Sequence, residues 1–239
     1  VGAATGLKVS PGTLTLGGFF QYGHGSYDSV NSFTTGKVKG SGDTSSYGVG
    51  GLARLDFDSG YYLETSLRVG KVESDYKGSI VGIQAKYDIK AEYHGLHLGV
   101  GKFLQLSPAN QLELYGRYAW THQDGDTVKI DATHERLKLK AVDSVRARVG
   151  ARIFHHLDKR FALYGGLSVE REFDGEADAS TADGHQLDSP EMKGNSRIVE
   201  LGLKIAPTQS LPWSTAVGVQ AYGGKREGVT ASAVFNYHF

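Results

Sequence analysis

Residues 145–153 read VRARVGARI, and two kinds of side chain alternate along this stretch. Valine, alanine and isoleucine fill the odd positions, whereas Arg146, Arg148 and Arg152 stand at even positions. Because successive side chains of a β-strand point to opposite faces, this stretch predicts a strand with one apolar and one basic face. Apolar residues at helical spacing are hard to find anywhere in the chain.

The same period of two recurs in YLETSLRV (62–69), LELYGRYAW (112–120), FALYGGLSVERE (161–172) and VELGLKI (199–205). The 33 glycines, 13 tyrosines and 10 phenylalanines also favour strands and tight turns over helices. A formal net charge of zero argues against nucleic acid as a partner, and the absence of cysteine excludes disulfides and thiolate chemistry. We find no domain boundary, so we expect a single all-β domain over residues 1–239.

The connections between the predicted strands differ in length. Short turns are predicted at 10–13, 58–60, 106–111, 155–160, 207–213 and 223–228, and longer polar links at 26–46, 75–90, 122–136 and 174–196. The long links carry glycine, serine, aspartate and threonine, which is the composition of exposed loops. The chain is therefore predicted to form about eleven antiparallel strands joined as successive hairpins.

The alternating strands leave two architectures to decide between. A soluble β-sandwich or lipocalin-like barrel would bury the apolar face, whereas a transmembrane barrel turns that face to lipid. Many strands reach the roughly 9–11 residues that cross a bilayer, and their polar faces carry ladders of charge. Aromatic residues near strand ends match the girdles of a membrane barrel: Tyr47, Phe57, Tyr118, Trp120, Phe235 and Phe239. We therefore predict a transmembrane antiparallel up-and-down β-barrel in a lipid bilayer, without any transmembrane helix.

The chain ends in VTASAVFNYHF (229–239), which alternates up to its last residue. A barrel has no free edge only when its last strand is paired, so these residues are predicted to be a strand. The pattern Phe235-x-Tyr237-x-Phe239 resembles the C-terminal signature of Gram-negative outer-membrane proteins. That resemblance implies a signal read by the barrel-assembly machinery, with short turns in the periplasm and long links outside. Bacterial barrels have even strand numbers, so we expect twelve strands, the first lying before Val1 or hidden in our segmentation.

Nearly the whole chain resembles the autotransporter β-domain, the translocator of type V secretion. The stretches that carry this resemblance are LTLGGFFQYGHGSYDS (14–29), YGVGGLARLDFDSGYYLETSLRVGKVESDY (47–76), YHGLHLGVGKF (93–103), LELYGRYAWTHQDG (112–125) and ASAVFNYHF (231–239). The resemblance implies a twelve-stranded barrel of the cell outer membrane that helps to export an N-terminal passenger, with the passenger or a linker helix in the lumen. We expect no passenger or linker helix within these residues, and we carry over no cleavage residue.

One face of the predicted strands collects charged side chains, which we expect to line the lumen: Glu64, Arg68, Glu113, Arg117, Arg146, Arg148, Arg152, Glu170, Glu172, Glu200 and Lys204. This face is either a hydrophilic conduit or a set of cross-strand ion pairs that brace the wall, and both readings are compatible. We expect the three arginines of 145–153 to face Glu170 and Glu172 across the turn at 155–160.

We expect no catalytic residue, cofactor or metal site. An outer-membrane protease needs Asp and His groups that converge, and the nearest candidates are His122 with Asp124 and Asp126, and His185 with Asp183 and Asp188. A phospholipase needs a lipid-facing serine next to a histidine, and we expect no histidine adjacent to Ser144 or Ser214, which sit near predicted strand starts. The stretch DGDTVKID (124–131) has too few ligands for a calcium loop. A passive porin-like channel and, behind it, an outer-membrane hydrolase are the alternatives to a translocator.

Overall fold

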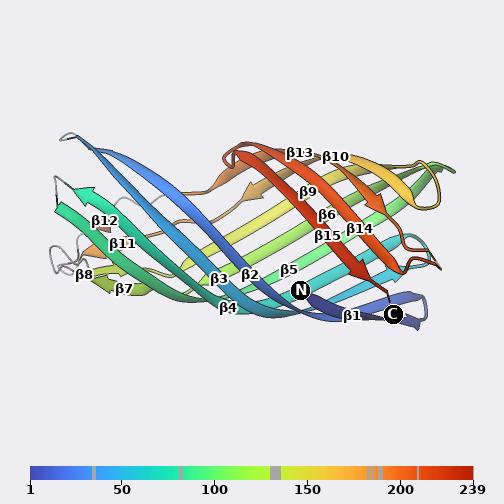
Figure 1. Cartoon of the computed structure of the whole chain (residues 1–239), viewed down its shortest axis with the longest axis horizontal. Coiled ribbons are helices and arrows are strands. Elements are labelled where there is room, and N and C mark those ends of the chain that lie inside the picture. Colours follow the sequence, from blue (N-terminus) through green and yellow to red (C-terminus); the bar gives the residue numbers. More distant parts are fainter. Residues whose placement is uncertain are drawn as a thin grey trace.

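A computed structural model describes residues 1–33, 36–80, 83–129, 136–181, 184, 186–187, 191–208 and 210–238. Eleven strands form one antiparallel sheet that curls around a central axis (Figure 1). They are β1 (Gly2–Val9), β2 (Gly12–Phe33), β3 (Gly36–Phe57), β4 (Tyr61–Ile80), β5 (Ile83–Ser107), β6 (Asn110–Gln123), β9 (Val142–His156), β10 (Phe161–Glu172), β13 (Gly194–Ile205), β14 (Trp213–Gly224) and β15 (Gly228–Tyr237). Each strand pairs with the sheet strands before and after it along the chain, which confirms the predicted succession of hairpins.

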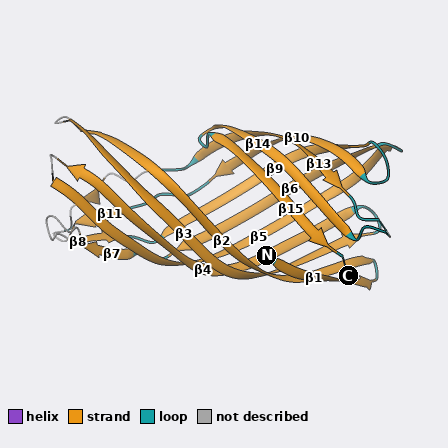
Figure 2. Ribbon diagram, viewed as in Figure 1, coloured by secondary structure: helices purple, strands orange, loops and turns teal. Residues whose placement is uncertain are grey.

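Four short strands form a second sheet, in the order β12-β11-β8-β7. They are β7 (Asp126–Lys129), β8 (Arg136–Leu139), β11 (Ala179–Thr181) and β12 (Gln186–Leu187). Strands dominate the described residues, and no helix among them is long and apolar enough to span a bilayer (Figure 2). The second sheet was not predicted from the sequence, because strands this short carry no readable period.

Five of the six predicted short turns gather at one end of the curled sheet, and the sixth, at 223–228, joins the opposite ends of β14 and β15 (Figure 1). Strands β2 to β5 extend past the other strands of the sheet toward that opposite end. In the turn between β9 and β10, the carboxylate of Asp158 accepts hydrogen bonds from the N–H groups of Phe161 and Arg160 at 2.8 and 2.6 Å. These two donors stabilise the charged carboxylate and lower the pKa of Asp158. The turn is therefore held by backbone hydrogen bonds to one side chain.

Two of the predicted long loops are wrong. Residues 26–46 and 75–90 mostly continue the paired strands, with β2 running for 22 residues, β3 for 22, β4 for 20 and β5 for 25. Tyr76 and Tyr87 stack across the β4–β5 extension, with ring centroids 4.9 Å apart. The sequence did not reveal these extensions because both of their faces are polar, so the apolar alternation that marks a strand is missing.

The main sheet is not closed into a complete barrel, because its first and last strands do not pair with each other in the described residues. Among the described residues, β1 pairs only with β2 and β15 only with β14, so no first-to-last pair closes the barrel. All residues of β1 and of β15 are exposed. Eleven strands are confirmed, and the expected twelfth strand stays a prediction.

Large apolar side chains are exposed and several charged side chains are buried, which is the reverse of the distribution in a soluble protein. Leu63, Leu67 and Leu201 are 50%, 63% and 66% exposed, whereas Glu113 and Glu200 are 3% and 4% exposed. A soluble sandwich or lipocalin-like barrel would show the reverse, because water-facing leucines and buried carboxylates both cost free energy. The soluble alternative is therefore excluded.

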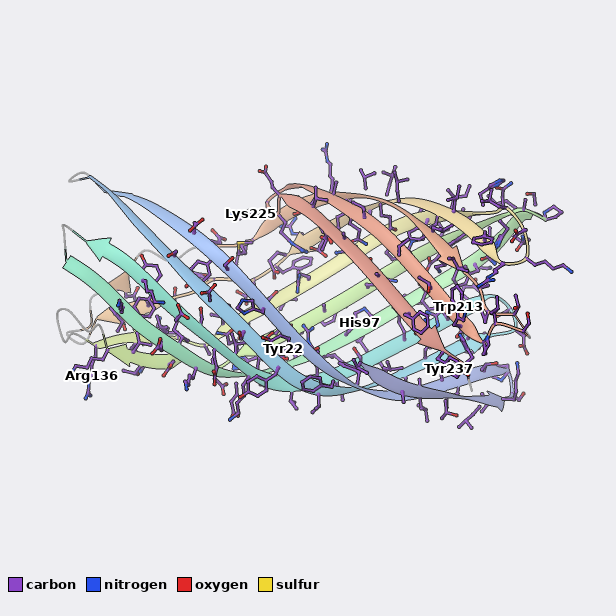
Figure 3. The ribbon with its side chains drawn as sticks, viewed as in Figure 1. Tyr22, His97, Arg136, Trp213, Lys225 and Tyr237 are labelled. Carbon is purple, nitrogen blue, oxygen red and sulfur yellow. The ribbon has the colours of Figure 1, made fainter. Side chains whose placement is uncertain are left out.

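The exposed face carries a continuous apolar band. On β9 the band runs from Ile153 to Val145, and at the turn-side end of the sheet Trp213 and Tyr237 lie opposite each other on β14 and β15 (Figure 3). Nine residues at a rise of about 3.3 Å, tilted by roughly 45°, give a band about 20 Å tall, close to that of membrane barrels. Polar residues such as Lys71 and Glu92, which pair at 3.1 Å, follow the band on the loop side.

Candidate functional site: the charged inner face

The inner face is the face of the main sheet that carries the buried carboxylates. Side chains meet across it from strands that are not neighbours, such as Tyr62 on β4 and Glu113 on β6, whose oxygens lie 2.6 Å apart. Residues on next-but-one strands meet in this way only on the concave side of a curled sheet. All eleven residues predicted to share a charged face lie on this side, by their position in the strand registers.

Arg152 is the centre of the first cluster on the inner face. Its guanidinium donates to Glu200 through two nitrogens, both at 2.9 Å, and to Glu113 at 3.0 Å. Tyr62 donates to the other oxygen of Glu113, and Gln220 donates to Glu200 at 3.1 Å. A buried ion pair stabilises a fold only when its remaining hydrogen-bonding positions are filled, and here both carboxylates have a second donor.

The predicted ladder between β9 and β10 is confirmed for two of its three arginines. Arg148 pairs with Glu170 at 2.7 Å, and Arg146 lies 3.6 Å from Glu172. Arg152 does not face either glutamate, because its partner across the register is Gly166. This glycine leaves room for the arginine to reach Glu200 on the strand beyond.

Several residues of the ion-pair network on the inner face were not predicted from the sequence. Arg54 binds Asp56 at 2.8 Å and Glu64 at 2.9 Å, and Arg117 lies 3.4 Å from Glu64. The stretch LARLDF at 52–57 alternates like the others and could have revealed Arg54 and Asp56. Arg226, which binds Glu170 at 2.6 Å, lies in a turn and has no periodic signal.

Two of the predicted basic residues have no carboxylate within ion-pair distance among the described residues. Arg68 donates to the hydroxyl of Thr121 at 2.9 Å. Lys204 places its ammonium 4.3 Å from the centroid of the Phe154 ring. The inner face is thus braced by ion pairs without being fully neutralised by them.

The predicted assembly signal lies at the turn-side edge of the apolar band. Phe235 and Tyr237 are 68% and 56% exposed on β15, and Phe235 stacks with Trp213 at a centroid distance of 6.1 Å. Phe239 lies outside the described residues. The two described aromatics share the outer face with the band, as their alternation predicts.

The protease candidates do not form a catalytic group. His122 forms a hydrogen bond with Asp143 through Nδ1 at 3.0 Å, and its Nε2 lies 3.5 Å from Asp124. Asp126 accepts a hydrogen bond from the N–H of Lys90. His122 also shares the outer face with Trp120 rather than pointing across the barrel mouth. His185, Asp183 and Asp188 lie outside the described residues.

The sequence missed one serine–histidine contact. Ser214 Oγ lies 3.0 Å from His238 Nε2, and Asn236 donates to the same hydroxyl at 3.3 Å. The expectation that Ser214 has no adjacent histidine is therefore wrong. The pair sits on the inner face rather than toward lipid, and no carboxylate contacts His238 within the described part of the chain. Nor do the described histidines and acidic residues group in a way that could hold a metal.

Residues 1–218 match the family model described as the autotransporter beta-domain. The chain belongs to this family. Over 247 aligned residues it is 27% identical to the pertactin autotransporters of Bordetella parapertussis and Bordetella bronchiseptica, covering 91% of this chain. It spans only 25% of the length of each of these relatives.

Solved structures share the fold of this autotransporter β-domain. The β-domain of the Bordetella autotransporter BrkA superimposes with a TM-score of 0.71 at 17% identity, covering 100% of this chain and 88% of the other. The transport unit of AIDA-I from Escherichia coli gives 0.68 at 18% identity, covering 100% and 80%. The translocator domain of NalP from Neisseria meningitidis gives 0.66 at 16% identity, covering 95% and 83%.

Proposed function

We propose that this β-domain is a single outer-membrane translocator over residues 1–239 that takes part in exporting an N-terminal passenger to the cell surface. The observation that carries the proposal is the match of residues 1–218 to the autotransporter beta-domain. The geometry supports it, because a polypeptide crossing a membrane needs an enclosed polar surface on which its amide groups stay hydrogen-bonded.

The eleven charged residues of the inner face would line an aqueous lumen that holds the passenger or a linker helix. Their ion pairs brace the wall, and unpaired groups such as Arg68 and Lys204 keep it wet. The apolar band would face the hydrocarbon of the outer membrane, with the five short turns that share one end of the sheet on the periplasmic side. Phe235, Tyr237 and Phe239 would be the part of the chain that the barrel-assembly machinery reads.

Surface display of an epitope tests the proposal. The full-length gene product carries an epitope tag before Val1, and whole cells are stained with an antibody that cannot cross the outer membrane. We expect surface staining that is lost when residues 229–239 are deleted. A correctly inserted protein whose tag stays inside the cell would contradict export.

The same cells distinguish a translocator from a passive porin-like channel. A porin would admit small solutes whether or not a segment precedes residue 1, and it would display no tag.

For the hydrolase, we expect His122→Ala and Asp124→Ala to leave any hydrolysis of peptide or lipid by the purified protein unchanged, since both ring nitrogens of His122 already face carboxylates.

A further inference from the structure

A pocket of about 350 Å³ opens on the inner face and is lined by residues of β2, β4, β5, β6, β9 and β10. Its charged lining consists of Arg68, Arg117, Arg146, Arg148 and Glu170. Its wall also includes His97, which Figure 3 places in the middle of the curled sheet. We call this site the arginine pocket. Four guanidinium groups and one carboxylate make it strongly basic in a chain whose formal net charge is zero.

The carboxylates around the arginine pocket are too few to neutralise it. Glu64 is shared between Arg54 and Arg117, and Glu170 is shared between Arg148 and Arg226. With Asp56, Glu172, Arg146 and Arg68 included, six arginines face four carboxylates in the network that the described residues form. The cluster around Arg152, by contrast, sets one arginine and Lys204 against Glu113 and Glu200. Excess positive charge is therefore concentrated at the arginine pocket.

Hydrogen-bond donors in the pocket also lack acceptors. Within the described part of the chain, Arg68 donates its side-chain hydrogen bond to the hydroxyl of Thr121, a neutral acceptor, and has no carboxylate within ion-pair distance. The Nε atoms of Arg117 and Arg146 are buried and form no hydrogen bond, although they lie 3.4 and 3.6 Å from glutamate oxygens. A buried donor without an acceptor costs free energy that an anionic oxygen would recover. The planar guanidinium fork matches the two oxygens of a carboxylate.

We propose that the arginine pocket binds carboxylate side chains of a polypeptide segment that lies along the inner face. The inference rests on the proposed function, which brings a polypeptide to this face, and it adds that the favoured segment is acidic. Arg68 is the main anchor, because no carboxylate of the described chain neutralises it. Acidic segments would dwell at the pocket, and basic segments would pass it without binding.

Current block in planar bilayers tests the arginine pocket. The purified chain is inserted into a lipid bilayer, and hexaglutamate or hexalysine is added to the side of the long strand extensions. We expect hexaglutamate to block the current at a concentration at least tenfold lower than hexalysine, because its carboxylates can accept hydrogen bonds from the arginines and the lysine ammonium groups cannot.

Two variants and a matched control locate the effect. Arg68→Gln should raise the half-blocking concentration of hexaglutamate about tenfold. Arg68→Lys should restore only part of the block, because it keeps the charge but loses the planar fork. Lys204→Gln removes another unpaired cation of the inner face, away from the arginine pocket, and should leave the block unchanged. Removing Arg68 leaves no carboxylate without its partner, so this variant should fold.

The proposal that the arginine pocket binds carboxylates would be wrong if the two peptides blocked the current equally. It would also be wrong if Arg68→Gln left the block by hexaglutamate unchanged. If Arg68→Gln does not insert, the comparison of the two peptides on the unaltered chain decides. A folded and inserted chain that conducts no ions would instead contradict the aqueous lumen, and with it the proposed function.

Discussion

At the residue scale, the inner face depends on hydrogen bonds that all three nitrogens of the Arg152 guanidinium donate to Glu113 and Glu200. Glu113 and Glu200 are almost fully buried, and each would be left as an uncompensated charge if that arginine were removed. Breaking a buried pair by removing one partner typically costs about 3–5 kcal/mol.

We therefore expect Arg152→Ala to lower the free energy of unfolding by about 3–5 kcal/mol. Lys102→Ala removes an outward-facing cation that contacts Tyr61, and it should cost less than about 1 kcal/mol. Urea unfolding of the chain in lipid vesicles, followed by tryptophan fluorescence, measures both. Equal losses in the two variants would show that the Arg152 cluster does not brace the sheet.

The adjacent glycines Gly165 and Gly166 offer a second test, because they point to opposite faces. A Cβ at Gly166 would press on the carboxylate of Glu200 and on the carbonyl oxygen of Ala151, whereas one at Gly165 would approach only Leu201 and the carbonyl of Glu200. We expect Gly166→Ala to cost about 1–3 kcal/mol through overpacking, and Gly165→Ala to cost less. The same unfolding measurement compares them, and a larger loss for Gly165→Ala would contradict the assigned faces.

At the element scale, the sequence predicted strands wherever one face meets lipid and failed where neither does. VRARVGARI, VELGLKI and the rest could be read because apolar and charged residues alternate in them. Past Tyr22 on β2 the outward positions are His24 and Ser26, so the period vanishes although the strand continues. Ion pairs across a register, such as Arg148 with Glu170, followed from hairpin geometry. Contacts that cross a strand, such as Arg152 with Glu200, depend on barrel curvature and could not be predicted.

The stacked tyrosines of the β4–β5 extension predict its resistance to protease. Aromatic cross-strand pairs stabilise a sheet by about 0.5–1.5 kcal/mol, and this stack joins β4 to β5 in a part of the sheet where β3 also pairs with β4, up to Gly78. We expect Tyr76→Ala to speed trypsin cleavage at Lys77 and Lys86 while the rest of the sheet stays resistant. Tyr61→Ala, at the opposite end of β4, should leave those cleavage rates unchanged. Mass spectrometry of timed digests reads both sites, and unchanged cleavage in Tyr76→Ala would remove the tyrosine stack as the cause.

If the apolar band lies in the bilayer, the destabilisation caused by a lysine substitution depends on how deep in the band the residue lies. Leu201 lies in the middle of the band on β13, and Val229 lies at its loop-side end on β15. We expect Leu201→Lys to destabilise the inserted chain by about 2–4 kcal/mol and Val229→Lys by about 0–1 kcal/mol. Equal costs in vesicle-based unfolding would mean that the band does not cross the bilayer.

At the scale of the whole molecule, the curled sheet has one charged face and one apolar face. Charged side chains pair on the concave inner face, and leucines, valines and aromatics cover the outer face. The family match gives this architecture its role, and the exposed edges of β1 and β15 leave room for the predicted twelfth strand. In lipid, unpaired edge groups cost several kcal/mol each, so closure of the barrel is expected in the membrane.

Spin labels along β13 test the two faces most directly, and the absence of cysteine makes single-cysteine variants clean. Labels are placed in turn at Val199, Glu200, Leu201, Gly202 and Leu203 of the chain reconstituted in vesicles. Their collision rates with oxygen, which partitions into lipid, and with a water-soluble nickel complex are then measured. The account predicts high oxygen accessibility at 199, 201 and 203 and low accessibility at 200 and 202. Accessibility without this period of two, or with the opposite phase, would contradict a lipid-facing apolar band.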